Sequence, residues 1–194
     1  KAIIVVSLFG QTANFKEIKK ISKKIPIIED GAQSFGSSHH RLKSCNLSLI
    51  GCTSFFPSKS LGCYGDGGAI FTNNDEIAEK CRSIRFHGTT EKERYHSEVI
   101  GLNGRLDSIQ AAVLLEKLSI FENELEMRNE IDRFYRKHLD IAQYHPNNYQ
   151  SAHALFSIVL DSSAKREKLH NKLSEKGIPT AIYYKYPIHL MQAF

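Results

Sequence analysis

The sequence has no long hydrophobic run, no closely paired cysteines and no basic arm, and each absence excludes a class of protein. The longest unbroken apolar runs, Ala2–Val6 and Ala111–Leu115, are much shorter than the ~20 residues of a membrane-spanning helix. The four cysteines, at positions 45, 52, 63 and 81, form no CxxC pair and have no zinc-binding spacing. The basic residues are scattered, which disfavours nucleic acid as a partner.

What is present is the composition of a soluble protein with a core. Apolar residues make up 41% and charged residues 24% of the 194 positions, which excludes general disorder, collagen and a coiled coil. Lysine and arginine number 26 against 21 aspartates and glutamates, a net charge of +5, and this excess fits a protein that handles anionic small molecules. No signal peptide is visible, so we expect a cytoplasmic protein with reduced thiols.

The first part of the chain alternates strands and helices. Ala2–Leu8 is a β-branched run typical of a buried strand. Asn14 can cap a helix that reaches about Lys24, and Pro26–Glu29 begins a second strand that ends at Asp30. A strand–helix–strand unit favours a parallel sheet with a right-handed crossover.

Further elements follow in the same order. Strands are predicted at Gly51–Phe56 and Gly68–Thr72, and a helix follows that either Asn74 or Asp75 caps. Residues 87–102 are polar and irregular, which is typical of a long surface loop.

The second part of the chain begins with an unusually long helix. From Arg105 to about Leu139 the apolar residues keep a helical spacing, and a helix of this length commonly joins two domains. Strands are predicted at Ala152–Leu160 and Ile178–Tyr184, with a helix at Ala164–Glu175 between them.

These elements predict an α/β fold in three parts. Residues 1–103 form part of a large sheet domain, residues 104–139 a linking helix, and residues 140–194 the beginning of a smaller α+β domain. Lys1 leads directly into a strand, and Phe194 follows soon after another strand begins, so we expect a piece of a longer protein.

Asp30 directly follows an apolar strand, in IIEDGAQSFG. A carboxylate at the carboxyl end of a parallel strand lies where α/β proteins bind ligands, and there it needs a cationic partner or good hydrogen bonds. Asp30 is equally well placed to cap a short helix at residues 31–35, so this segment alone leaves both interpretations open.

Lys59 lies between Pro57 and Gly62, in GCTSFFPSKSLGCYGDGGA. A lysine held in an apolar turn loses part of what stabilises its charged form, and the neutral amine is the nucleophile of Schiff-base chemistry. An exposed loop lysine is the ordinary alternative. Lys59-Ser60 also matches the end of a phosphate-binding loop, but Ser58 stands where that loop needs its second glycine, so we reject this interpretation.

Weaker signals surround these two residues. Ser54 near a strand end can donate to a phosphate, and the glycines of the GDGGA turn let a backbone approach a ligand. Asn103 and Arg105 open the long helix, where Arg105 can clamp a carboxylate with two bonds. His189, in YPIHL, is a further candidate. Each of these also has an ordinary explanation as a turn, surface or structural residue.

Taken in order, these residues resemble a known family. Asp30, Gln33, Ser54, Lys59 and the segments GDGGA and GLNGRLD follow the pattern of the DegT/DnrJ/EryC1/StrS aminotransferases, enzymes of pyridoxal-phosphate fold type I that act on nucleotide-linked keto sugars. KAIIVVSLFGQTANF, SAHALFSIVL and YPIHLMQAF are similar to further segments of that family, so the resemblance covers nearly the whole chain. The region around Lys59 especially resembles the branch that aminates UDP-3-keto-N-acetylglucosaminuronic acid.

The resemblance implies a role for each residue toward the cofactor. It makes Lys59 the residue that bonds pyridoxal phosphate as the internal aldimine and later moves protons. Asp30 keeps the pyridinium nitrogen protonated, and Gln33 contacts the ring or its phenolic oxygen. Ser54 donates to the cofactor phosphate. Asn103 reaches the phosphate of the neighbouring subunit, which implies a homodimer.

For the substrate, the resemblance implies Arg105 as the partner of a carboxylate and His189 as a contact from the substrate loop. The implied reaction transfers an amino group from an amino acid, with glutamate as the expected donor, to a keto carbon of a UDP-sugar, for a surface polysaccharide such as LPS O-antigen. Relatives with dehydratase chemistry have His in place of the Schiff-base lysine, so Lys59 favours transamination.

The chain also departs from the family's pattern. The amino-terminal portion, whose glycine-threonine turn holds the cofactor phosphate, is missing, as is the end of the small domain, and Ser7 replaces a common His. Two other hypotheses stay open. One is a truncated, non-catalytic chain that dimerises, and the weaker one is a nucleotide-binding or kinase-like protein, based on Lys59-Ser60 and the positive charge.

Overall fold

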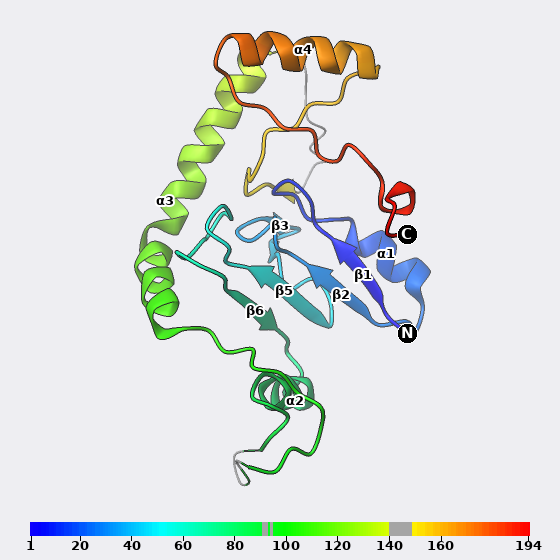
Figure 1. Cartoon of the computed structure of the whole chain (residues 1–194), viewed down its shortest axis with the longest axis vertical. Coiled ribbons are helices and arrows are strands. Elements are labelled where there is room, and N and C mark those ends of the chain that lie inside the picture. Colours follow the sequence, from blue (N-terminus) through cyan, green and yellow to red (C-terminus); the bar gives the residue numbers. More distant parts are fainter. Residues whose placement is uncertain (91–92, 94, 140–148) are drawn as a thin grey trace. The chain divides into compact units, whose positions relative to one another are not determined.

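Two units make up the chain in the computed structural model, Lys1–Ser157 and Ile158–Phe194. The first holds a four-stranded sheet and the long helix α3 (Figure 1). The structure describes residues 1–90, 93, 95–139 and 149–194. The three-part division that we predict at residues 103 and 139 stays a prediction.

The sheet of the first unit has the strand order β1-β2-β5-β6 (Figure 1). β1 (Ile3–Val6) pairs parallel with β2 (Ile27–Asp30), and β2 pairs parallel with β5 (Ile50–Ser54). β6 (Gly68–Phe71) runs antiparallel to β5. The predicted parallel strand–helix–strand unit is therefore confirmed, and the fold is α/β with a mixed sheet.

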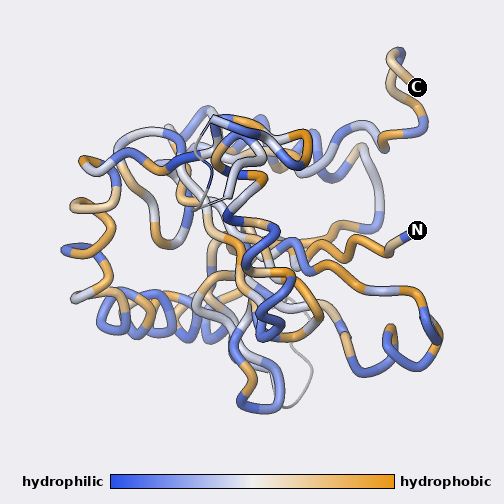
Figure 2. The backbone as a smooth tube through the Cα atoms, turned by 90° about the horizontal axis from the view of Figure 1, so that it is seen from below, coloured by the Kyte–Doolittle hydropathy of each residue, from blue (hydrophilic) through white to orange (hydrophobic). Residues whose placement is uncertain are grey.

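α1 (Phe15–Ser22) connects β1 to β2. Asn14 caps this helix as predicted, because its Oδ1 accepts a hydrogen bond from the backbone N of Glu17 at 3.2 Å. Phe15 is buried against Val5 of β1 in the smaller of two core clusters. In Figure 2 the strand that follows the N-terminus is coloured as hydrophobic, although only Val5 of β1 is buried and Ile4 and Val6 are exposed on its other face.

α2 (Asp75–Arg85) follows β6. Of the two predicted caps, Asn74 is the one used, since its Oδ1 accepts a hydrogen bond from the N of Ile77 at 2.9 Å. The long helix α3 (Ser108–His138) begins three residues later than predicted. Asp107, the residue before the helix, has an extended backbone.

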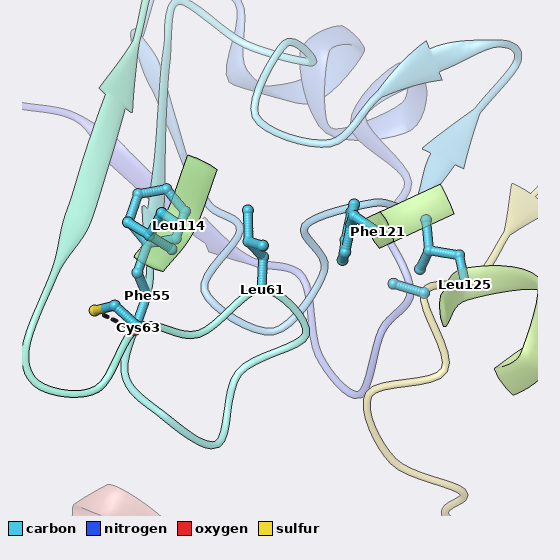
Figure 3. Close-up of a cluster of buried hydrophobic side chains, with 7 residues drawn as sticks. Phe55, Leu61, Cys63, Leu114, Phe121 and Leu125 are labelled. Carbon is cyan, nitrogen blue, oxygen red and sulfur yellow. Dashed lines mark hydrogen bonds between the residues drawn. The ribbon is translucent and has the colours of Figure 1, made fainter. Parts of the chain in front are cut away.

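α3 supplies one side of the larger core (Figure 3). Buried residues of the helix meet residues of the segment that follows β5. The cluster consists of Phe55, Leu61, Cys63, Leu114, Phe121, Leu125 and Ala152. The segment that carries Lys59 is thereby packed onto α3.

A second, smaller sheet was not predicted. β4 (Leu42–Lys43), β3 (Ser38–His39) and β7 (Tyr149–Gln150) form it, with antiparallel pairs throughout. Strands of two residues leave no alternation in a sequence, so periodicity does not reveal them.

The second unit contains α4 (Ser163–Glu175) and the short 3₁₀ helix η1 (Ile188–Leu190). The prediction of α4 is confirmed. The strands predicted at Ala152–Leu160 and Ile178–Tyr184 are wrong, because both segments are irregular. A strand needs a neighbouring strand to satisfy its backbone groups, and the described residues supply none at either place.

None of the helices in the described part of the chain is both long and apolar enough to cross a membrane. Within those same residues, no three His, Cys, Asp or Glu side chains gather as metal ligands would.

Candidate active site

Asp30 and Ser54 end two neighbouring parallel strands, so both lie at the carboxyl edge of the sheet. The register pairs Asp30 with Cys52. Because side chains alternate between the two faces of a strand, Asp30, Cys52 and Ser54 share one face. All three are half-buried, so a ligand can reach them. The structure therefore brings two of the predicted site residues together.

The backbone after Asp30 turns and does not form a helix. An oxygen of the Asp30 carboxylate accepts a hydrogen bond from the N of Ala32 at 3.0 Å. This bond orients the carboxylate at the strand end, as in an Asx turn. The alternative that Asp30 caps a helix at residues 31–35 is therefore wrong.

Gln33 joins the turns that follow β1 and β2. Its Oε1 accepts a hydrogen bond from the N of Phe9 at 2.9 Å. The next residue, Gly10, has a φ of +98°, and a Cβ built on it would lie 2.6 Å from the N of Ala154. The turn thus requires glycine, and Gln33 is held at the same edge of the sheet as Asp30.

Lys59 lies in a loop that is closed at its base. The N of Lys59 donates to the carbonyl of Phe56 at 2.9 Å, and the N of Cys63 donates to the carbonyl of Phe55 at 2.8 Å. Ser54 Oγ accepts from the N of Phe56 at 3.2 Å, which ties the strand end to the loop. Lys59 itself is half-buried.

The structure confirms that the segment around Lys59 is not a phosphate-binding loop. In such a loop the lysine opens a helix. Here residues 57–61 form turns and bends, and the next helix begins only at Asp75.

The GDGGA turn has a packing role in this structure. A Cβ on Gly68 would lie 2.8 Å from the carbonyl O of Thr53, and one on Gly67 would lie 3.1 Å from Cys63 Sγ. These glycines let β6 begin directly against β5 and the Lys59 loop.

Asn103 and Arg105 lie together, away from the edge that carries Asp30. Arg105 Nε donates to Asn103 Oδ1 at 2.8 Å, and the Arg105 guanidinium stands 5.7 Å from the centroid of the Phe86 ring. Phe86 directly follows α2, which lies at the opposite end of the sheet from the carboxyl ends of β2 and β5 (Figure 1). Within one chain the structure does not bring these two exposed residues to Lys59.

His189 belongs to the second unit, where it is exposed in η1. Its predicted contact with a substrate stays a prediction.

Glu29 is a buried carboxylate that the sequence-based reasoning missed. Its side chain is fully buried, Oε1 accepts from Ser44 Oγ at 2.9 Å, and Oε2 accepts from the N of Leu47 at 3.1 Å. Burial, followed by the Glu29 carboxylate, raises the pKa of Cys45 to about 12. The alternation of side chains along β2 could have revealed it, because Glu29 lies two residues after the buried Ile27 and therefore on the same face of the strand.

Glu29 therefore anchors the segment around Cys45 onto β2, one residue before Asp30. Gly51 permits the same contact from β5, since a Cβ there would lie 2.2 Å from the Cys45 carbonyl O. The strand end that carries Asp30 is fixed from its buried side.

His153 also lies near the turn at this edge. Its Nδ1 is 3.4 Å from Asp132 of α3, and Arg136 Nε donates to the same carboxylate at 2.6 Å. Burial is the largest effect and lowers the pKa of His153; Arg136 and Arg128 act the same way, against the opposing Asp132 carboxylate. Ala152 N donates to the carbonyl of Gly10 at 2.7 Å, so this group connects α3 to the turn after β1.

The sequence of the chain is similar to known proteins. The model of the DegT/DnrJ/EryC1/StrS aminotransferase family matches residues 1–194. The UDP-2-acetamido-2-deoxy-3-oxo-D-glucuronate aminotransferase of Pseudomonas aeruginosa is 48% identical over 199 residues, which is 100% of this chain and 54% of that protein. The chain spans about half the length of the curated relatives it matches.

Solved structures are similar as well. A DegT DnrJ EryC1 StrS aminotransferase from Brucella abortus has a TM-score of 0.91 at 45% identity and covers 100% of this chain, which covers 52% of it. The E. coli GDP-4-keto-6-deoxy-D-mannose-3-dehydratase with bound hydrated PLP has a TM-score of 0.80 at 26% identity, with 92% and 52% covered. This similarity confirms the fold class predicted from the sequence.

Proposed function

This chain belongs to the DegT/DnrJ/EryC1/StrS aminotransferase family, and we propose that its protein is a pyridoxal-phosphate-dependent aminotransferase of a keto nucleotide sugar. One observation carries the proposal. Asp30 and Ser54 share one face at the ends of adjacent parallel strands, and Lys59 follows in a loop whose base is closed by backbone bonds. An acid, a hydroxyl and an amine are thereby offered at one edge of the sheet.

The chemistry of these side chains fits the cofactor. Pyridoxal phosphate, when bound, supplies a cationic ring that takes up electrons. The Asp30 carboxylate would pair with the ring nitrogen, and its bond to Ala32 already orients it. Ser54 would donate to the phosphate, Gln33 would contact the ring, and Lys59 would bond the cofactor and then carry protons.

For the substrate, we propose a UDP-linked 3-keto sugar acid and an amino-acid donor, with glutamate first to be tested. The support is the Pseudomonas aeruginosa relative, whose name states a UDP-linked 3-oxo-glucuronate. The net charge of +5 suits such anions. Arg105 and His189 are the proposed contacts of the substrate. The enzyme would act in the cytoplasm, and its product would be used to make a surface polysaccharide such as LPS O-antigen.

We also propose that the active unit is a homodimer. Asn103 is exposed and bridges to Phe86, directly after α2. Since α2 lies at the end of the sheet opposite to the carboxyl ends of β2 and β5 (Figure 1), a role at the cofactor phosphate requires that Asn103 act on a second copy. Asn103 Oδ1 accepts the bond from Arg105, so the NH2 group of the Asn103 amide is the part that would donate to the phosphate.

The test is a chimera in which residues 1–194 replace the matched part of the Pseudomonas aeruginosa relative. We expect Lys59→Ala to abolish turnover of the keto sugar with glutamate, and Lys24→Ala, at an exposed position of the first unit, to leave it unchanged. Borohydride should fix pyridoxal phosphate to the peptide that contains Lys59. Turnover that survives Lys59→Ala would refute the proposed function.

A second candidate is a non-catalytic protein that dimerises. It is favoured by the sheet face that carries Asp30, on which Ile4, Val6 and Ile70 are 67%, 46% and 56% exposed. An apolar face of this kind calls for a cover. A monodisperse, folded dimer of the 194-residue chain without cofactor, measured by light scattering, would support this candidate, and a monomer or an aggregate would count against it.

A further inference from the structure

Two cationic side chains of α3 reach the loop that carries Lys59. Arg128 Nη2 donates to the carbonyl of Ser60 at 3.2 Å, and Lys117 Nζ donates to the carbonyl of Gly62 at 2.6 Å. The two carbonyls follow Lys59 by one and three residues. We propose that Arg128 and Lys117 are positioning residues, which set where the Lys59 amine stands.

The residue between the two carbonyls is also fixed. Leu61 is 4% exposed and packs in the cluster with Leu114, Phe121 and Leu125 of α3 (Figure 3). The loop is therefore held by polar bonds on both sides of a buried anchor. The backbone bond from the N of Lys59 to the carbonyl of Phe56 closes the other side, which leaves the side chain of Lys59 as the part that can move.

Tyr64, two residues after Gly62, is bound to the same helix. The N of Tyr64 donates to Gln110 Oε1 at 2.8 Å, and Lys117 Nζ stands 5.8 Å from the centroid of the Tyr64 ring.

The bonds from Arg128 and Lys117 have ionised donors, and such bonds are stronger than neutral ones. Arg128 is itself oriented by Glu124, at 3.8 Å on the preceding turn.

Position matters here because a reactive amine must stand within about 0.5 Å of its productive place. The core contacts of Leu61 fix the loop's depth on α3. The bonds from Arg128 and Lys117 fix the orientation of its peptide groups. This inference rests on the proposed function only in making Lys59 the reactive lysine; the hold on the loop is a property of the chain itself.

The test without cofactor is hydrogen exchange on the whole 194-residue chain, measured by mass spectrometry. In Arg128→Met we expect the amides of Lys59 and Cys63 to exchange about tenfold faster, which corresponds to about 1.4 kcal/mol. Arg133→Met is the matched control, because Arg133 lies on the same helix, is 65% exposed and bonds to Glu126 of that helix, away from the loop.

Arg128→Lys keeps a cationic donor and should restore slow exchange at these amides. Lys117→Met should act like Arg128→Met, and Lys137→Met, an exposed lysine of the same helix, should not. Equal exchange in Arg128→Met and Arg133→Met would overturn the proposal. So would a rise spread evenly over the whole chain, because that would mean loss of overall stability.

The second measurement uses the chimera and borohydride trapping of pyridoxal phosphate on Lys59. Arg128→Met should slow trapping about tenfold relative to Arg133→Met, and Arg128→Lys should restore most of it. If Lys59 is never trapped while exchange responds as expected, the proposed function fails and the positioning role stands. If Lys59 is trapped equally in both methionine variants, the positioning role fails and the proposed function stands.

Discussion

Replacing Glu29 tests how the strand end beside Asp30 is held. Glu29→Ala removes the acceptor of two hydrogen bonds in a fully buried place. The Ser44 hydroxyl can turn to Ser34 Oγ, which is 2.6 Å away. Among the described residues the backbone N–H of Leu47 bonds to Glu29 alone, so it is left buried and unpaired.

The expected loss of stability follows mainly from the one donor that is left unpaired, the N–H of Leu47. A stranded buried donor costs about 1–3 kcal/mol, and the space left by the missing side chain adds to this. We expect Glu29→Ala to lower the free energy of unfolding by about 2–4 kcal/mol. Glu29→Gln keeps an acceptor for Leu47 and offers an amide to Ser44, so its cost should be below about 1.5 kcal/mol.

Urea unfolding of the 194-residue chain measures the difference. With a slope of about 2 kcal/mol per molar urea, the midpoint should fall by about 1–2 M in Glu29→Ala and by less than about 0.8 M in Glu29→Gln. Glu17→Ala, at an exposed glutamate of α1, is the control and should leave the midpoint unchanged.

A second readout concerns Cys45. Both Glu29 variants remove a charge that raises the pKa of Cys45, so that pKa should fall below about 12 while burial still keeps it above its ordinary value. Equal urea midpoints for Glu29→Ala and Glu29→Gln would refute the reasoning, because the two hydrogen bonds would then carry no stability.

Three further predictions concern other parts of the chain. Burial lowers the pKa of His153 from 6.5, so the unfolded chain binds a proton at a higher pH than the folded chain does. The urea midpoint should therefore fall as the pH falls below about 6.5, and in His153→Gln it should not show this fall. Gly10→Ala should cost about 3 kcal/mol by urea unfolding, since its Cβ would meet backbone at 2.6 Å, whereas Gly177→Ala, with nothing within 4 Å, should cost about 1 kcal/mol. Iodoacetamide at about pH 8 should label the half-exposed Cys81 and spare the buried Cys45; rapid labelling of Cys45, found by peptide mass spectrometry, would contradict its raised pKa.

The sequence by itself determined the strands and helices of the larger sheet of the first unit. The apolar runs around Ile4 and Ile28 and the cap at Asn14 predict a parallel strand–helix–strand unit, and the structure confirms it. Each of these signals acts within one segment, through side-chain alternation or a bond to a backbone N–H three residues away. The order of Asp30, Gln33, Ser54 and Lys59, followed by GDGGA and GLNGRLD, predicts the family, and the match to its model confirms it.

Tertiary structure decided what depends on partners far apart in the sequence. The run at Ala152–Leu160 has the composition of a strand but no neighbouring strand among the described residues, since pairing is settled by the whole sheet. The burial of Glu29 and its bonds to Ser44 and Leu47 depend on a segment 15 to 18 residues away. The bond from Arg128 to the carbonyl beside Lys59 joins residues 68 positions apart, and only packing of α3 against the loop brings them together.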